Sequence, residues 1–319
     1  MKNIIFLFLF VINTNSLLAQ EDVEVHEVEV NPKIDYQMLE RQLSTGNLEM
    51  YGINKFPFDK IYDTNKNIKR LIINESFELS SLPESVKKFK SLTTVIISGV
   101  SLREFPIGFC YIDSLTSFIY DSNHTTVIPK EIVNLKNLKS LHLERMPIKE
   151  LPKEIGSLEN LEGLIIQETE GNYTIAGIPF KLDGIHYIPK EIGNLKSLKQ
   201  LLLDRNNLVK IPKEIGFLNN LAILSIRGNK LKILPMEICN LQNLENLLLS
   251  DNALEFLPKD IGNLKNLKIL SLNNNNLKYL PENIENLKKL KRLDVKGNKI
   301  PEEKLIKLRE KLPNTEIIY

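Results

Sequence analysis

Prolines recur along this chain at a nearly constant interval of 23 residues. One longer gap of 37 residues separates Pro152 from Pro189. The recurring prolines are Pro83, Pro106, Pro129, Pro152, Pro189, Pro212, Pro235, Pro258 and Pro281. A fixed period of this length, with leucines at constant offsets, is typical of a solenoid built from stacked repeats and not of a closed globular domain. The period therefore determines the fold class.

Each repeat combines two hydrophobic spacings. The unit that starts at Leu244 reads LQNLENLLLSDNALEFLPKDIGN, and the next unit reads LKNLKILSLNNNNLKYLPENIEN. The central Leu-x-Leu alternates with a period of two, which predicts a strand with one buried face. Pro-x-x-Ile-x-x-Leu changes to a period of three to four, which predicts a short helical turn with proline at its start. We interpret a recurring glycine as the residue that keeps this turn short; it stands at Gly156, Gly193, Gly216 and Gly262.

The repeated segments LPKEIGNLKNLK resemble the leucine-rich repeat family, in the 23-residue class of plant Ras-group-related and many bacterial proteins. The resemblance extends over about residues 48–319. It implies an α/β solenoid, an arc with a parallel β-sheet on the concave face and short helical or 3-10 turns on the convex face. Ten strand units are expected, after a degenerate half-unit at 48–57, and they start at Ile68, Leu92, Leu115, Leu138, Leu161, Leu198, Leu221, Leu244, Leu267 and Leu290.

The first 19 residues differ from the rest of the chain. Lys2 is followed by nine apolar residues, Ile4–Ile12, and then by a polar stretch that ends near Ala19, so residues 1–19 are predicted to be a signal peptide. Nine residues are too few to cross a bilayer core of about 30 Å as a helix, so no stable membrane insertion is expected. The mature protein is expected to be exported, whether periplasmic, on the cell surface or secreted.

The remaining chain is expected to form three parts. Residues 20–47 are interpreted as a tail and an amino-terminal cap, and residues 48–300 as the solenoid. Residues 301–319 are interpreted as a carboxy-terminal cap, with a helix that begins near Pro301 and carries Leu305, Leu308 and Leu312 on one face.

In the family, an asparagine after each strand bonds to the backbone of adjoining turns. It stands here as Asn123, Asn206, Asn229, Asn252, Asn275 and Asn298. Other residues replace it at Ser76, Val100, Met146 and Thr169. The amino-terminal half is therefore expected to be the less regular and less stable one, because its backbone groups must find other partners.

The longer proline gap contains 14 extra residues, 170–183, directly after a predicted strand. We expect an inserted loop that leaves the edge of the sheet. Tyr173 and Phe180 are candidate aromatic anchors for a partner. A functionally neutral insertion is the alternative, since long surface loops add little closure entropy.

The sequence contains no combination of residues that indicates catalysis. The four histidines fit no zinc motif, and no HExxH, CxxC, G-x-S-x-G or glycine-rich phosphate loop is present. We therefore expect no enzyme, cofactor or metal site. Lys and Arg (42) nearly balance Asp and Glu (40), so nucleic acid is not an expected partner. Cys110 and Cys239 lie five repeats apart, too far to pair, and are expected to be buried, although an intermolecular bridge or a reactive thiol is the alternative.

The middle residue of each Leu-x-Leu strand is expected to point into the concavity. The candidate partner-binding residues at this position are Ile72, Ile96, Ile119, His142, Ile165, Leu202 and Leu248. With polar residues on both sides, they would form an exposed apolar stripe with a polar rim, the composition of a protein interface. Strand propensity alone also favours isoleucine at such positions, and this explanation stays open.

The favoured function is an exported, non-enzymatic module that binds a protein or peptide through the concave sheet, and a monomer is expected. A passive cell-envelope or adhesion scaffold is one alternative. An intracellular signalling adaptor is another, if the signal peptide is misread.

Overall fold

The structure is a computed structural model that describes residues 46–55, 61–62, 67–121, 124–168, 170–175 and 178–319. The predicted signal peptide, nearly all of the predicted tail and cap, and Asn123 lie outside these residues. No helix in the described ranges is long and apolar enough to span a bilayer.

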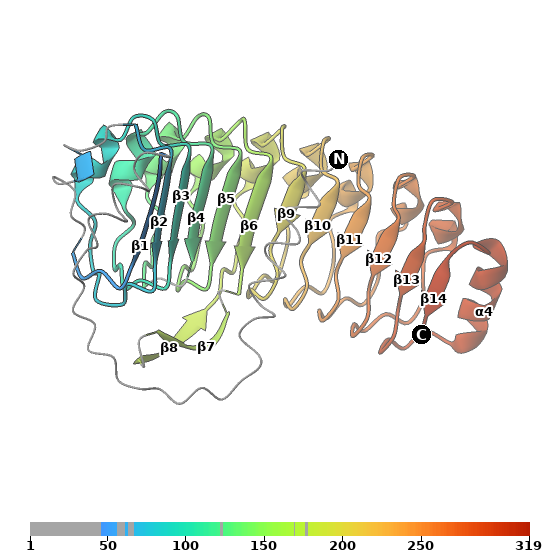
Figure 1. Cartoon of the computed structure of the whole chain (residues 1–319). Helices are drawn as coiled ribbons and strands as arrows, with labels where there is room; N and C mark the ends of the chain where they lie inside the picture. Colours follow the sequence, from blue (N-terminus) through green and yellow to red (C-terminus); the bar gives the residue numbers. More distant parts are fainter. Residues whose placement is uncertain (1–45, 56–60, 63–66, 122–123, 169, 176–177) are drawn as a thin grey trace. The chain divides into compact units, whose positions relative to one another are not determined.

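Twelve strands form one open sheet in which every neighbouring pair is parallel. They follow one another in sequence order across the sheet (Figure 1). The strands are β1 (Asn47–Tyr51), β2 (Arg70–Asn74), β3 (Thr94–Ser98), β4 (Ser117–Asp121), β5 (Ser140–Glu144), β6 (Gly163–Gln167), β9 (Gln200–Leu202), β10 (Ile223–Ser225), β11 (Asn246–Leu248), β12 (Ile269–Ser271), β13 (Arg292–Asp294) and β14 (Glu316–Ile318). The predicted parallel sheet is confirmed, with a strand from each of the ten predicted units.

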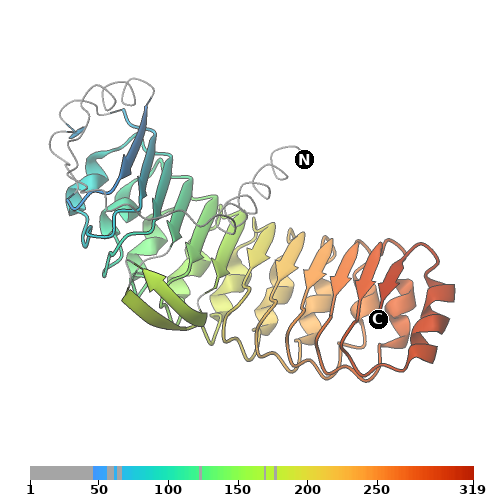
Figure 2. The same ribbon diagram turned by 60° about the horizontal axis from the view of Figure 1, so that its bottom comes forward.

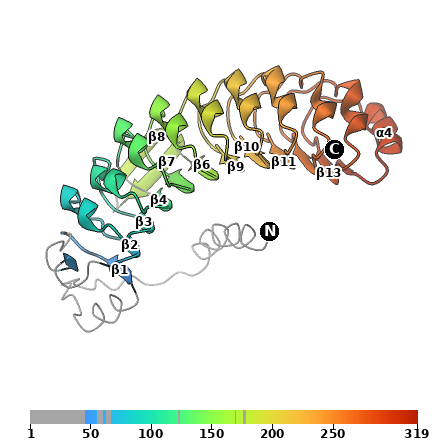
Figure 3. The ribbon, with the colours of Figure 1, turned by 90° about the horizontal axis from the view of Figure 1, so that it is seen from above.

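Short 3-10 turns lie on the side of the repeats opposite the sheet, along the outside of the bend (Figure 3). They are η1 (Glu84–Lys88), η2 (Ile107–Tyr111), η3 (Lys130–Asn134), η4 (Lys153–Ser157), η5 (Lys190–Asn194), η6 (Lys213–Phe217), η7 (Met236–Asn240), η8 (Ile261–Asn263) and η9 (Glu282–Asn286). A repeat proline precedes each turn directly, except at η8, where Asp260 takes this place. Proline fits there because its φ is already suitable and no N–H is needed.

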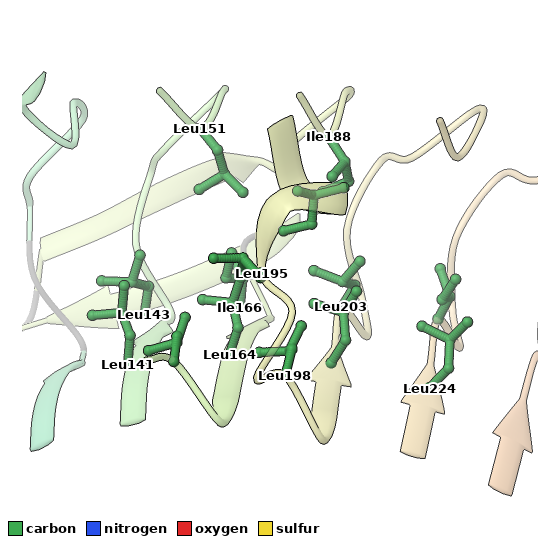
Figure 4. Packing of buried hydrophobic residues seen from close by; sticks show 14 of the residues in the cluster. Leu141, Leu143, Leu151, Leu164, Ile166, Ile188, Leu195, Leu198, Leu203 and Leu224 are labelled. Atoms are coloured by element: carbon green, nitrogen blue, oxygen red, sulfur yellow. The ribbon is translucent and has the colours of Figure 1, made fainter. Parts of the chain in front are cut away.

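The core lies between the sheet and the turns. Leucines of the Leu-x-Leu strands, such as Leu141 and Leu143, point into the same interior as the leucines that follow the turns, such as Leu195 and Leu198 (Figure 4). All four are fully buried. Since each repeat packs on the equivalent residues of its neighbours, the core is continuous along the stack, and a single repeat has too little buried surface to fold alone.

The asparagine ladder forms in the carboxy-terminal half. Asn252 is typical: its Nδ2 donates to Ile226 O (2.8 Å), and its Oδ1 accepts from Leu231 N (3.1 Å). Ser76, which was expected to interrupt the ladder, instead substitutes for asparagine, because its Oγ accepts from Ile53 N of the preceding turn (3.1 Å). Strands β2–β6 have five residues and strands β9–β13 have three, so pairing between strands is longer in the half where several repeats lack the asparagine.

A second ladder was missed by the sequence analysis. At the edge where the chain enters each strand, an asparagine or serine side chain donates to a carbonyl of the preceding repeat. Asn137 donates to Asp113 O (2.9 Å) and Asn243 to Asn219 O (2.8 Å). The same bond recurs at Ser114, Asn160, Asn220 and Asn266.

The recurring glycine does not set the length of the turn, so this interpretation was wrong. Turn η7 carries Cys239 at the glycine position and has the same length as η6, which carries Gly216. Glycine instead allows neighbouring turns to approach closely: a Cβ on Gly193 would lie 2.5 Å from Glu214 O. Cys110 and Cys239 are both buried and unpaired.

Both ends of the sheet carry more structure than the sequence indicated. The predicted half-unit contains a complete strand, β1, whose five residues pair with β2. After the last repeat, helix α4 (Glu302–Lys311) buries Leu305 and Leu308, and Leu312, which follows the helix, is also buried. The chain then returns as β14, a strand that was not predicted, which pairs with β13.

The predicted insertion contains two paired strands, whereas only a loop was expected. Strands β7 (Glu170–Ile175) and β8 (Ile178–Asp183) pair antiparallel as a separate sheet. The hairpin lies beside the ends of β4–β6 (Figure 2).

Candidate binding face on the concave sheet

The strand register sets the predicted binding residues in one row across the sheet. Each pairs directly with the next, as Ile96 does with Ile119 and Ile119 with His142. The complete row is Glu49, Ile72, Ile96, Ile119, His142, Ile165, Leu202, Ser225, Leu248, Ser271, Asp294 and Ile318. We call these residues the central row.

The prediction of an exposed stripe was wrong at three of its seven residues. Ile96, Ile119, Leu202 and Leu248 are partly exposed. Ile72, His142 and Ile165 are exposed by only 6%, 3% and 5%. Parallel strands about 4.8 Å apart bring neighbouring side chains over one another, so position on the outer face does not ensure access to solvent. The central row therefore offers partly exposed aliphatic side chains at three places, which are the neighbouring pair Ile96 and Ile119, then Leu202, then Leu248.

His142 lies between two polar neighbours on its own strand. Its Nε2 is 3.0 Å from Ser140 Oγ, and its Nδ1 is 3.8 Å from Glu144 Oε1. Burial lowers the pKa of His142 to about 4, so the ring is neutral at pH 7, although the nearby Asp121 acts in the opposite direction. His142 is therefore a buried polar residue that interrupts the central row.

A charged cluster lies where strands β4–β6 end, and it consists of Asp121, Glu144, Arg145, Glu168 and Arg205. Arg145 donates from Nε to Asp121 Oδ1 (2.8 Å) and from Nη2 to Asp121 Oδ2. Arg205 Nη1 pairs with Glu168 Oε1 at 2.9 Å. Burial, and then the charge of Asp121, raises the pKa of Glu144 to about 7, despite the opposing charge of Arg145. The cluster thus holds a carboxyl group that titrates near neutral pH.

A second charged group follows one repeat later. Asp204 accepts from Arg227 Nε (2.9 Å), from Ser225 Oγ (2.6 Å) and from the backbone N–H of Arg227 (2.8 Å). Gln167 Nε2 lies 3.5 Å from its Oδ2. These bonds hold the polar edge of the concave face in a fixed arrangement, which lowers the entropy cost of binding.

Three residues of the charged cluster have left-handed backbones. Arg145, Glu168 and Arg205 have φ values of 47°, 54° and 53°. Gly99, Gly228 and Gly297 occupy the equivalent position in other repeats, also with positive φ. Non-glycine residues there cost of order 1 kcal/mol each. These residues were not predicted from the sequence. They align with the glycines of other repeats, directly after the polar residue that follows each strand, and this alignment could have identified them.

The insertion is fixed at its base. Asp183 Oδ2 pairs with Lys149 Nζ at 3.3 Å, and Asp183 O accepts a bond from the side-chain amide of Asn207. Leu182 is fully buried. The two predicted aromatic anchors, Tyr173 and Phe180, stand directly opposite each other in the hairpin register.

The described residues contain no group of three or more His, Cys, Asp or Glu suited to a metal ion. Burial raises the pKa of the Cys110 thiol to about 12 and that of Cys239 to about 11, which disfavours reactive thiolates.

Comparison with known proteins agrees with this architecture. A family model described as leucine rich repeat matches residues 242–300. A leucine-rich repeat protein of Leptospira interrogans is 33% identical, with 82% of this chain and 74% of that chain covered and a TM-score of 0.57. No curated protein matches.

Plant receptors share the fold at lower identity. The ectodomain of the Arabidopsis thaliana receptor kinase GASSHO1/SCHENGEN3, in complex with CASPARIAN STRIP INTEGRITY FACTOR 2, is 28% identical with a TM-score of 0.58. The match covers 70% of this chain and 26% of that ectodomain, so the chain spans about a quarter of it. The structure of PEPR1-AtPEP1, 21% identical over 81% of this chain and 39% of that chain with a TM-score of 0.60, supports the fold alone. With its repeats, its open parallel sheet and the Leptospira relative, the chain belongs to the leucine-rich repeat family.

Proposed function

We propose that this protein is an exported, non-enzymatic recognition module that binds a protein or peptide across the concave sheet. The observation that carries the proposal is the in-register row in which Ile96, Ile119, Leu202 and Leu248 remain partly exposed. Aliphatic sites beside a charged edge match the composition of protein interfaces, where an apolar centre has a polar rim. The protein acts as a monomer, and nucleic acid is not its partner.

Two further observations support the proposal. The polar edge is already held by ion pairs such as Arg227–Asp204, so little side-chain entropy would be lost on binding. One structural relative is a receptor ectodomain whose structure contains a bound partner, which supports a binding role for the shared fold. Leucine-rich repeat proteins are generally binding modules, which supports a non-enzymatic role.

The test uses a matched pair of substitutions. Partners captured from the native envelope fraction would be identified and measured against Ile119→Asp, which puts a charge in the central row, and against Ile306→Asp, which puts it on exposed α4. We expect Ile119→Asp to weaken binding at least about tenfold and Ile306→Asp to leave it unchanged. Equal binding by both variants, each with a wild-type circular dichroism spectrum, would reject the concave face as the site.

A scaffold role is the second candidate, and a separate observation favours it. Exposed apolar residues recur two positions before the repeat prolines, outside the strands, at Val127, Tyr187, Ile233, Phe256 and Tyr279. Such a row suits lateral contacts with other envelope components. Loss of envelope association in Ile233→Ser with Phe256→Ser, but not in Ile119→Asp, would favour this role.

A further inference from the structure

The two outer edges of the inserted hairpin differ in whether another strand can add to them. Strands β7 and β8 form a sheet of two strands, and no third strand joins it in the part of the chain that the structure describes. Each strand therefore has one edge whose backbone N–H and C=O groups point away from its partner. Such edges can accept another extended chain.

The register identifies which backbone groups point outward. Pro179 has no N–H to donate, so its pair with Thr174 is of the type that exchanges no main-chain hydrogen bonds. Antiparallel pairs alternate between bonded and non-bonded types, so the pairs Thr174–Pro179 and Asn172–Lys181 are non-bonded. The backbone groups of Asn172 and Thr174 therefore face the outer edge of β7.

Proline blocks one of the two edges. Pro179 lies at a non-bonded position of β8, so its missing N–H is on the outer edge and not inside the hairpin. Proline on an edge strand hinders the addition of another strand. Strand β7, with the sequence EGNYTI, contains no proline. The hairpin is thus closed to strand addition along β8 and open along β7.

The base of the hairpin is held on the solenoid from both neighbouring repeats. The hairpin ends at Asp183, which bonds to Lys149 of the preceding repeat and to Asn207 of the following one. A two-stranded hairpin is marginally stable alone, and a third strand would add main-chain hydrogen bonds to it. Adding a strand to a hairpin with a fixed base costs less entropy than ordering a free loop.

We propose that the outer edge of β7 binds an extended segment of a partner protein by strand addition, through the backbone groups of Asn172 and Thr174. Main-chain hydrogen bonds provide the affinity in this mode of recognition, and alternate side chains of the added segment provide specificity. This site goes beyond the proposed function because it lies outside the central row, and either site can bind without the other.

The test uses short random peptides displayed on phage and selected on the mature protein. Enriched peptides are synthesised with a fluorophore, and their affinity is measured by anisotropy. Thr174→Pro removes an outward N–H from β7, and the matched control Lys181→Pro removes one from the edge that Pro179 already blocks. We expect Thr174→Pro to weaken binding about tenfold or more and Lys181→Pro to change it less than about twofold.

Hydrogen exchange on the unmodified protein provides a second measurement that needs no variant. Bound peptide should slow exchange at the amides of Asn172 and Thr174 and leave the amide of Lys181 unchanged. Unchanged exchange in β7, or a selection that enriches no peptide, would overturn the proposal. Peptides lost in Ile119→Asp but kept in Thr174→Pro would overturn strand addition and leave the concave site standing. A concentration-dependent dimer of the protein alone, abolished by Thr174→Pro, would assign the edge to a second copy and also overturn it.

Discussion

Arg145 and Asp121 form a two-point ion pair that joins neighbouring repeats on the concave face. Arg145 Nε lies 2.8 Å from Asp121 Oδ1, and Nη2 donates to Oδ2. Ser98 Oγ donates to the same carboxylate from the repeat before (2.9 Å). Since Asp121 is buried and Arg145 half-buried, the pair stabilises three successive repeats as well as forming part of the candidate binding edge.

Replacing Arg145 by glutamine should destabilise the solenoid. The substitution leaves the buried Asp121 carboxylate without its cationic partner, which we expect to cost about 2 kcal/mol of unfolding free energy. Arg205→Gln is the matched control, because it removes a pair in which the arginine is largely exposed and should cost less than about 1 kcal/mol. Urea denaturation measures both, and equal losses would contradict the importance assigned to Asp121.

The pH dependence of stability should show two opposing contributions. The pKa of Glu144 is raised to about 7 in the folded state, so its contribution favours folding at low pH and is lost as pH rises from about 4.5 to 7. The pKa of His142 is lowered to about 4, so its contribution is present above about 6.5 and is lost as pH falls towards 4. The two groups therefore change the free energy of unfolding in opposite directions over nearly the same pH range.

Single substitutions should separate these slopes. In Glu144→Gln the contribution of His142 remains, so stability should fall as the pH is lowered from 6.5 towards 4, by up to about 1.4 kcal/mol per unit. In His142→Asn the contribution of Glu144 remains, and stability should fall as the pH is raised from 4.5 to 7. Melting temperatures of both variants and the wild type, measured between about pH 4 and pH 7, test the direction of each change. The same sign of slope change in both variants would contradict the assignment.

The two side-chain ladders should differ in energetic importance. Asn252→Ala removes bonds to Ile226 O and Leu231 N and leaves buried backbone groups unpaired, which should cost about 2–4 kcal/mol. Asn243→Ala removes one bond to Asn219 O at an exposed edge, where water can replace it, and should cost about 1 kcal/mol or less. Chemical denaturation measures the difference.

Close stacking of the turns can be tested with a further matched pair of glycine substitutions. A Cβ on Gly193 would lie 2.5 Å from Glu214 O, whereas a Cβ on Gly163 would have Ser140 Oγ as its nearest neighbour at 3.9 Å. Gly193→Ala should therefore destabilise by about 1–3 kcal/mol, because the turns must separate. Gly163→Ala lies in strand β6 with open space around it and should be neutral or stabilising by up to about 1 kcal/mol. A stable Gly193→Ala protein would show that the stack can relax.

The sequence predicted the features that depend on one repeat at a time. Leucine offsets identify the strands because each leucine must face the core of its own unit, and Pro129 or Pro235 identifies the start of a turn by its own backbone geometry. Side-chain burial and pairing on the concave face, which depend on neighbouring repeats, were not predicted. The burial of His142 and the pairing of Arg145 with Asp121 arise only when the strands lie side by side.

Deleting residues 170–183 should leave a folded solenoid. Glu170 and Asp183 are opposite each other in the hairpin register, so the two ends that must be joined are already close together. Strands β6 and β9 on either side of the insertion pair directly, as any two consecutive repeats do. The deletion removes the Lys149–Asp183 pair, which is exposed and contributes little. We therefore expect nearly unchanged melting by circular dichroism, with loss of the peptides that need β7. An aggregated or unfolded deletion variant would show that buried Leu182 is a necessary part of the core.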